Sequence, residues 1–102
     1  MEVFTRLNKG EKEVIIDGKM TDYSEYIEVK RCLNEAIEDS KVKIYFVNAN
    51  VISPYILGYM LKLSENDNIN ISIIVSNALL YEFLQSIDFN KFFDIKIKEY
   101  QA

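Results

Sequence analysis

Short runs of aliphatic and β-branched residues alternate along the chain with segments of helical periodicity, and this alternation restricts the possible folds most strongly. Residues 13–17, 41–49 and 69–76 are rich in Ile and Val and are bounded by Asn, Asp, Gly or Lys, as buried strands are. Helical patterns at about 22–39, from about 53 onward and after Asn77 lie between or beyond them. This order predicts parallel strands joined by right-handed helical crossovers.

Two further segments are expected to complete the sheet. Residues 3–7 precede an Asn-Lys-Gly turn and form a hairpin with the first buried run, while residues 93–100 alternate apolar and charged side chains like an edge strand with one wet face. The predicted fold class is therefore α/β, a single domain over residues 1–102 with an N-terminal hairpin and a mostly parallel sheet covered by three to four helices. Five strand residues should be nearly fully buried beneath the helices: Ile15, Ile44, Phe46, Ile73 and Val75.

The helices carry start signals and apolar stripes. Thr21 or Asp22 is the expected N-cap of the first helix, with Glu25 placed to complete a capping box. At 100° per residue its buried stripe comprises Tyr26, Val29, Leu33, Ala36 and Ile37. The third helix should bury Leu79, Leu80, Phe83, Leu84 and Ile87 and leave Glu82 and Gln85 outside.

Composition removes several functional classes. The 12 basic and 16 acidic residues give a net charge of -4, which disfavours a general affinity for nucleic acid. The chain has no histidine, so imidazole triads and imidazole metal sites are excluded, and its single Cys32 is expected at the margin of the core. We therefore predict a protein with no enzymatic activity, no metal and no cofactor.

The hydropathy pattern bears on location. The longest apolar run is far shorter than the roughly 18 to 20 residues of a membrane helix, and the N-terminal segment lacks the apolar stretch of a signal peptide. One cysteine forms no internal disulfide, which is compatible with a reducing compartment. We predict a cytoplasmic protein without a membrane span.

The chain resembles the STAS domain family, which includes bacterial anti-sigma-factor antagonists and the cytoplasmic tails of sulfate transporters. "VIIDGKMT", residues 14–21, is similar to that family's second strand and the loop into its first helix, and "KIYFVNANVISPYILGYMLKL", residues 43–63, to its third strand and second helix. "FLQSIDFNKFFDI", residues 83–95, is similar to its closing segment. The resemblance covers nearly the whole chain and implies a STAS-like α/β sandwich that binds a regulatory protein, such as an anti-sigma factor or a kinase-like partner.

One motif departs from this family. Members that act in partner switching carry an Asp-Ser-Ser-Gly-Leu-Gly type of motif where this chain has "SPYILG", residues 53–58. Only Leu57 and Gly58 match; Ser53 falls on the acidic position and Tyr55 is the phosphoacceptor equivalent, on the position of the phosphorylated serine. A tyrosine hydroxyl lies several ångströms farther from the backbone, so a kinase site built for serine would misplace it. We therefore do not expect the usual serine switch.

The same segment predicts a binding surface. Ser53 suits an N-cap and Pro54 the first helical position. On a helical projection Ile56, Met60 and Leu63 form the buried stripe. The opposite side carries the predicted partner-binding residues, with two tyrosines beside a gap: Ser53, Tyr55, Gly58, Tyr59 and Lys62.

Three functional classes stay open from the sequence. The first is a STAS-like adaptor that binds a regulatory protein through this helix, with a homodimer as a further possibility. The second is a small-ligand module that holds an anion or a nucleotide at the start of the helix, which Pro54 disfavours because it lacks an N–H donor. The third is an accessory subunit of a larger assembly.

Overall fold

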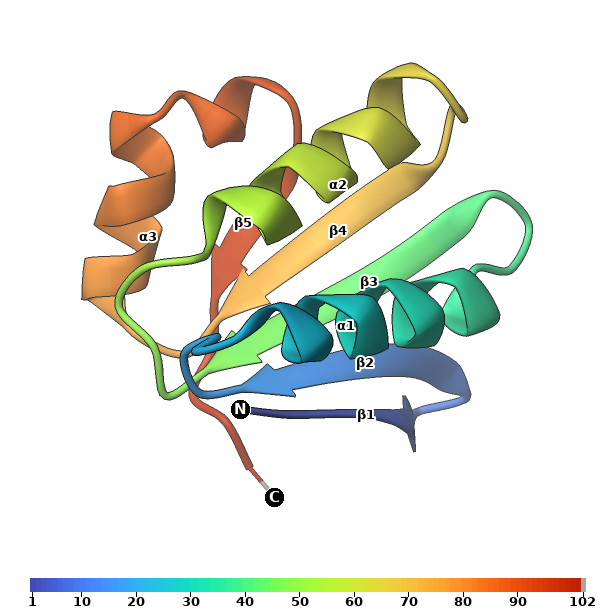
Figure 1. The fold of residues 1–102 in the computed structure, drawn as a ribbon, viewed down its shortest axis with the longest axis horizontal. Helices are drawn as coiled ribbons and strands as arrows, with labels where there is room; N and C mark the ends of the chain where they lie inside the picture. Colours follow the sequence, from blue (N-terminus) through green and yellow to red (C-terminus); the bar gives the residue numbers. More distant parts are fainter. Residues whose placement is uncertain (102) are drawn as a thin grey trace.

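The computed structural model describes residues 1–101 and has an α/β fold (Figure 1). Its strands and helices follow in the order β1 (Glu2–Asn8), β2 (Glu11–Asp17), α1 (Tyr23–Ala36), β3 (Lys41–Val47), α2 (Pro54–Glu65), β4 (Asn70–Val75), α3 (Ala78–Ser86), the 3-10 turn η1 (Phe89–Lys91) and β5 (Asp94–Ile97). The predicted order of strands and helices is confirmed.

One sheet of five strands has the spatial order β1-β2-β3-β4-β5. β1 is antiparallel to β2, and the other neighbours are parallel. Each helical crossover connects a strand to its immediate neighbour, and the three crossovers proceed in the same direction across the sheet. Because the connections are right-handed, all three helices lie on one face of the sheet (Figure 1). The opposite face, called here the open face, carries no helix among residues 1–101.

The core is divided by the sheet. On the helix side, alternate residues of the central strands, among them Ile44, Ile73 and Val75, pack against the helices. On the open face Ile15, Tyr45, Val47 and Ile74 form a second cluster, against which Tyr100 packs. Ile15 is fully buried as predicted but not beneath the helices, because side chains alternate along a strand and its neighbours Val14 and Ile16 take the helix side.

The last strand is shorter than predicted. β5 ends at Ile97, where Lys98 N–H donates to Val75 O at 2.9 Å and β4 offers no further partner. The expectation of a strand to residue 100 is wrong, because the alternating pattern continues after the neighbouring strand has ended. Residues 98–101 instead cross the open face, where the Tyr45 hydroxyl donates to Lys98 O and Arg6 donates to Gln101 O at 2.7 Å.

The helix starts agree with their sequence signals. Asp22 is the N-cap of α1 and forms the predicted capping box with Glu25. Ser53 and Asn77 cap α2 and α3. α1 stops at Ala36, three residues earlier than expected, because Ile37 is extended and Asp39 and Ser40 have positive φ.

The predicted inner face of α3 is partly wrong. Leu80 and Leu84 are buried, whereas Leu79 is 60% exposed and Ile87 lies beyond the helix as an exposed C-cap residue. Leu79 is in the first turn, on a flank that the sheet does not reach. No helix among residues 1–101 is long and apolar enough to cross a membrane.

Candidate functional site

The three helices begin at the same end of the molecule, where the parallel strands end (Figure 1). Large apolar side chains are exposed there: Tyr23 and Tyr55 in the first turns of α1 and α2, Leu79 in the first turn of α3, and Val51 in the loop before α2. Exposed apolar side chains that gather at one place are more informative than scattered ones. We call this group the apical surface.

The loop that leads into α2 is held by both neighbouring loops. Asn48 has φ 56° and its side-chain amide donates to Asp17 Oδ1 at 2.7 Å. On the other side, the Asn77 amide donates to Ala49 O at 3.1 Å. Ser53 is half-buried, and its hydroxyl oxygen accepts the Tyr55 N–H at 3.2 Å. The start of α2 is therefore fixed relative to the rest of the apical surface.

Four aromatic rings pack between α1 and α2, and we call Tyr23, Tyr26, Tyr55 and Tyr59 the tyrosine cluster. The centroids of Tyr23 and Tyr55 are 5.6 Å apart with the rings edge to face, and Tyr26 lies 5.5 Å from Tyr23 and 5.4 Å from Tyr55. Tyr59 meets Tyr26 edge to face at 6.4 Å. These separations lie in the range that favours aromatic pairs.

The predicted exposure of Tyr59 is wrong, since the side chain is only 5% exposed. The flank of α2 that carries it faces α1, where its hydroxyl donates to Asn34 Oδ1 at 2.6 Å. Burial raises the pKa of the Tyr59 hydroxyl. Tyr59 is thus part of the packing between two helices, and the structure separates it from the exposed Tyr55.

The other predicted residues of α2 lie on its accessible side. Tyr55 is 56% exposed, and Gly58 is exposed with open space around the position of a Cβ atom. Lys62 is exposed and pairs with Asp67 at 3.2 Å, while its Nζ lies 5.8 Å from the ring centroid of Tyr59. Ile56, Met60 and Leu63 are buried as predicted. Gly58 therefore leaves the surface of α2 open one turn after Tyr55.

Sequence reasoning missed the contribution of α1. Tyr23 is 58% exposed beside Tyr55, and Lys30 Nζ lies 5.4 Å from the ring centroids of both Tyr26 and Tyr59. A projection of one helix does not show which neighbour packs on its flank. The available signal was the pair of tyrosines at positions 23 and 26, one turn apart at the start of α1.

The start of α2 has few donors for an anion. Pro54 has no N–H, and the N–H of Tyr55 is taken by the Ser53 hydroxyl. Leu57 N–H donates to Ser53 O at 3.0 Å. The geometry therefore gives little support to the anion or nucleotide alternative.

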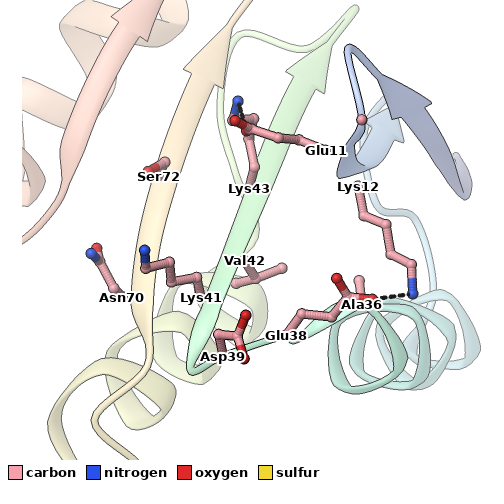
Figure 2. A pocket seen from close by; sticks show the side chains of 11 residues that line it. Glu11, Lys12, Ala36, Glu38, Asp39, Lys41, Val42, Lys43, Asn70 and Ser72 are labelled. Atoms are coloured by element: carbon pink, nitrogen blue, oxygen red, sulfur yellow. Dashed lines mark hydrogen bonds and ion pairs between the residues drawn. The ribbon is translucent and has the colours of Figure 1, made fainter.

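A cavity of about 320 Å³ lies at the opposite end of the sheet, between the hairpin turn, the loop after α1 and the first residues of β3 and β4 (Figure 2). Three acidic and three basic residues line it, and four of these six form ion pairs: Lys12 Nζ lies 2.7 Å from Glu38 Oε1, and Lys43 Nζ lies 2.6 Å from Glu11 Oε2. None of the predicted site residues lines it. Because both signs of charge alternate around the cavity, its walls select neither an anion nor a cation.

The groups that carry catalysis elsewhere have other roles in this structure. Cys32 is buried in the helix-side core, and burial raises the pKa of its thiol, which disfavours the nucleophilic thiolate. Among residues 1–101, no cluster of three or more His, Cys, Asp or Glu side chains could hold a metal ion.

Comparisons with known protein families, with curated proteins and with solved structures found no match.

Proposed function

We propose that the chain is a non-enzymatic protein-binding module of the STAS type, which binds a regulatory protein through the apical surface. The observation that carries this proposal is the pair of rings of Tyr23 and Tyr55, each more than half exposed and each held by the other at 5.6 Å. Two different helices supply them, so the pair forms only in the folded domain.

The rings suit a protein interface in physical terms. Tyrosine offers a large contact area with few rotatable bonds, so little conformational entropy is lost when a partner covers it. Contacts with Tyr26 restrain both rings further. Aromatic residues of this kind are enriched among those that contribute most to binding.

The rest of the apical surface extends the contact area. Val51 lies in the loop before α2 and Leu79 in the first turn of α3, both at this end of the sheet, and exposed Gly58 leaves open surface one turn after Tyr55. The free thiol of Cys32 is compatible with the reducing cytoplasm, which is the compartment that we propose.

The test compares the affinity-captured proteins of three forms of the chain. Tyr55→Ala removes half of the ring pair, and Phe92→Ala is the matched control because Phe92 is also an exposed aromatic, 54% exposed, but follows η1. We expect one protein that wild type and the control retain with equal affinity and that Tyr55→Ala binds at least about thirtyfold more weakly.

Equal retention by all three forms would overturn the assignment of the surface. If the purified chain hydrolyses or covalently modifies the protein that it captures through Tyr55, the proposed non-enzymatic function is wrong.

A further inference from the structure

The two edges of the sheet differ in how they are protected. β5 has four residues and carries the exposed charges of Asp94 and Lys96. β1 has seven residues, pairs with β2 in an uninterrupted register and contains no proline. It also exposes Leu7, at 72%, and Phe4, at 37%. A long, regular edge with exposed apolar side chains is suited to pairing with another strand.

The outward backbone groups of β1 follow from its pairing. Lys9 and Gly10, with φ 53° and 82°, form a two-residue turn, so Asn8 and Glu11 exchange hydrogen bonds across it. Because this exchange recurs every second residue, the N–H and C=O groups of Val3, Thr5 and Leu7 point to the free edge. The hydrogen bond from Gly18 N–H to Val47 O agrees with this alternation. It shows that, at the end of β2, the backbone groups of an even-numbered residue point toward β3, so those of the odd-numbered residues point toward β1.

A cavity of about 250 Å³ opens beside the same edge. It is lined by Met1 to Phe4 of the edge itself and by Glu25 and Glu28 of α1. Val3 packs partly against the helix-side core, so its side chain lies on the face that α1 covers. Leu7 is on the same face by the two-residue period, but it extends beyond this contact.

We propose that β1 pairs antiparallel with β1 of a second copy of this chain, in a register centred on Thr5. Two-fold symmetry makes such an interface self-complementary. In this register Leu7 of each copy lies opposite Val3 of the other, and therefore at the cavity that Val3 lines. Leu7 of each copy fills the cavity of the other copy, and the two five-stranded sheets form one continuous sheet.

Charge is compatible with this register. Glu2 lies opposite Asn8 of the second copy, and Lys9 of that copy follows beside it. Among residues 1–101, neither Glu2 nor Lys9 belongs to an ion pair within the chain, so each is available to the other. Registers centred on Val3 or on Leu7 would also pair the outward N–H and C=O groups, but they would leave most residues of β1 without a partner. The interface lies at the β1 edge and is independent of the function proposed for the apical surface.

Sedimentation velocity of the purified chain tests the proposal. We expect a species of twice 11.9 kDa at about 100 μM, and Leu7→Glu should weaken the association at least about tenfold, because its carboxylate would face Glu25 and Glu28 of the second copy. Ile97→Glu on β5 is the matched control, because Ile97 is 50% exposed on the other edge, and it should leave the dimer unchanged. A chain that stays monomeric at this concentration, or a dimer that Leu7→Glu leaves intact, would overturn the proposal.

Cross-linking tests the register. Opposed residues of a hydrogen-bonded antiparallel pair have Cα atoms about 5.5 Å apart, which a disulfide can bridge. Thr5→Cys should therefore give a covalent dimer on oxidation, while the buried Cys32 stays reduced and Lys96→Cys on β5 gives none. Equal cross-linking of both variants, or none with Thr5→Cys, would show that Thr5 is not at the two-fold axis and would refute the register.

Discussion

The ring of Tyr23 on α1 meets the ring of Tyr55 on α2 edge to face, at a centroid distance of 5.6 Å. Both rings keep more than half of their surface exposed. Their contact joins the starts of two helices at the end of the sheet where the parallel strands stop. It therefore places aromatic area on the surface without leaving either ring unsupported.

A double-mutant cycle measures how much this contact stabilises the domain. Edge-to-face pairs contribute about 0.5 to 1.5 kcal/mol beyond burial, so Tyr23→Ala and Tyr55→Ala should show a coupling energy of that size in urea unfolding. Each single variant should fold, since both rings are exposed. Strictly additive effects of the two substitutions would contradict a direct contact between the rings.

Tyr59 should respond in the opposite way to Tyr55. Replacing a buried aromatic with alanine costs about 3 to 5 kcal/mol, so Tyr59→Ala should lower the urea midpoint strongly. Tyr59→Phe, which removes only the hydrogen bond to Asn34, should cost about 1 kcal/mol. Met60→Ala serves as a control for loss of a fully buried side chain from the same helix. If Tyr59→Ala unfolds like wild type, α1 does not cover that flank of α2.

Tyr55 and Tyr59 show which features of this site the sequence predicts and which it does not. The projection of α2 correctly separated the buried Ile56, Met60 and Leu63 from Tyr55, because those three residues face the sheet. Tyr59 lies on the flank, and whether a flank is exposed depends on the neighbouring helix. That neighbour is set by the direction of the crossovers, which the pattern of one helix does not contain.

The strands show the same limit. Continuous apolar runs in β2, β3 and β4 predicted buried strands, and the Asn-Lys-Gly turn predicted the hairpin, because both signals are local. The side of the sheet on which Ile15 lies and the path of residues 98–101 depend on contacts between distant segments. The cavity near Lys43 and Glu38 is likewise formed by three separate segments.

Serine phosphorylation at the start of α2 is not expected. The Ser53 side chain is half-buried and accepts the Tyr55 N–H as the N-cap of α2, and Pro54 restricts the backbone that a kinase would have to extend. Incubation with a serine kinase that acts on partner-switching STAS proteins should leave residues 53–58 unmodified in a mass spectrum. A phosphate on Ser53 or Tyr55 would contradict this prediction and restore a switch at this position.

Glu25 should make the domain sensitive to acid. Its carboxylate accepts the Thr21 N–H at 2.6 Å and lies 3.0 Å from the terminal amine of Met1, and these contacts lower its pKa from 4.5 to about 2. A folded-state pKa below the unfolded value stabilises the fold above the unfolded pKa, and this contribution is lost as the pH falls from about 4.5 to about 2. Glu25→Gln should therefore lower the Tm at pH 7, and the difference from wild type should shrink toward pH 2. A Tm difference that does not change over this range would contradict the lowered pKa of Glu25. Glu82→Gln, on the exposed face of α3, is the control.

The segment after β5 should stabilise the open face of the sheet. The Tyr100 ring meets Tyr45 edge to face at 5.3 Å, and the Arg6 guanidinium lies 4.9 Å from the Tyr100 centroid. An aromatic pair contributes about 0.5 to 1.5 kcal/mol and a cation–π contact at an exposed site about 0.5 to 1 kcal/mol, so Tyr100→Ala should cost roughly 1 to 2.5 kcal/mol in urea unfolding. Lys96→Ala, an exposed side chain on β5, should stay within about 0.5 kcal/mol of wild type. If Tyr100→Ala changes the urea midpoint no more than Lys96→Ala does, residues 98–101 do not cover the open face in solution.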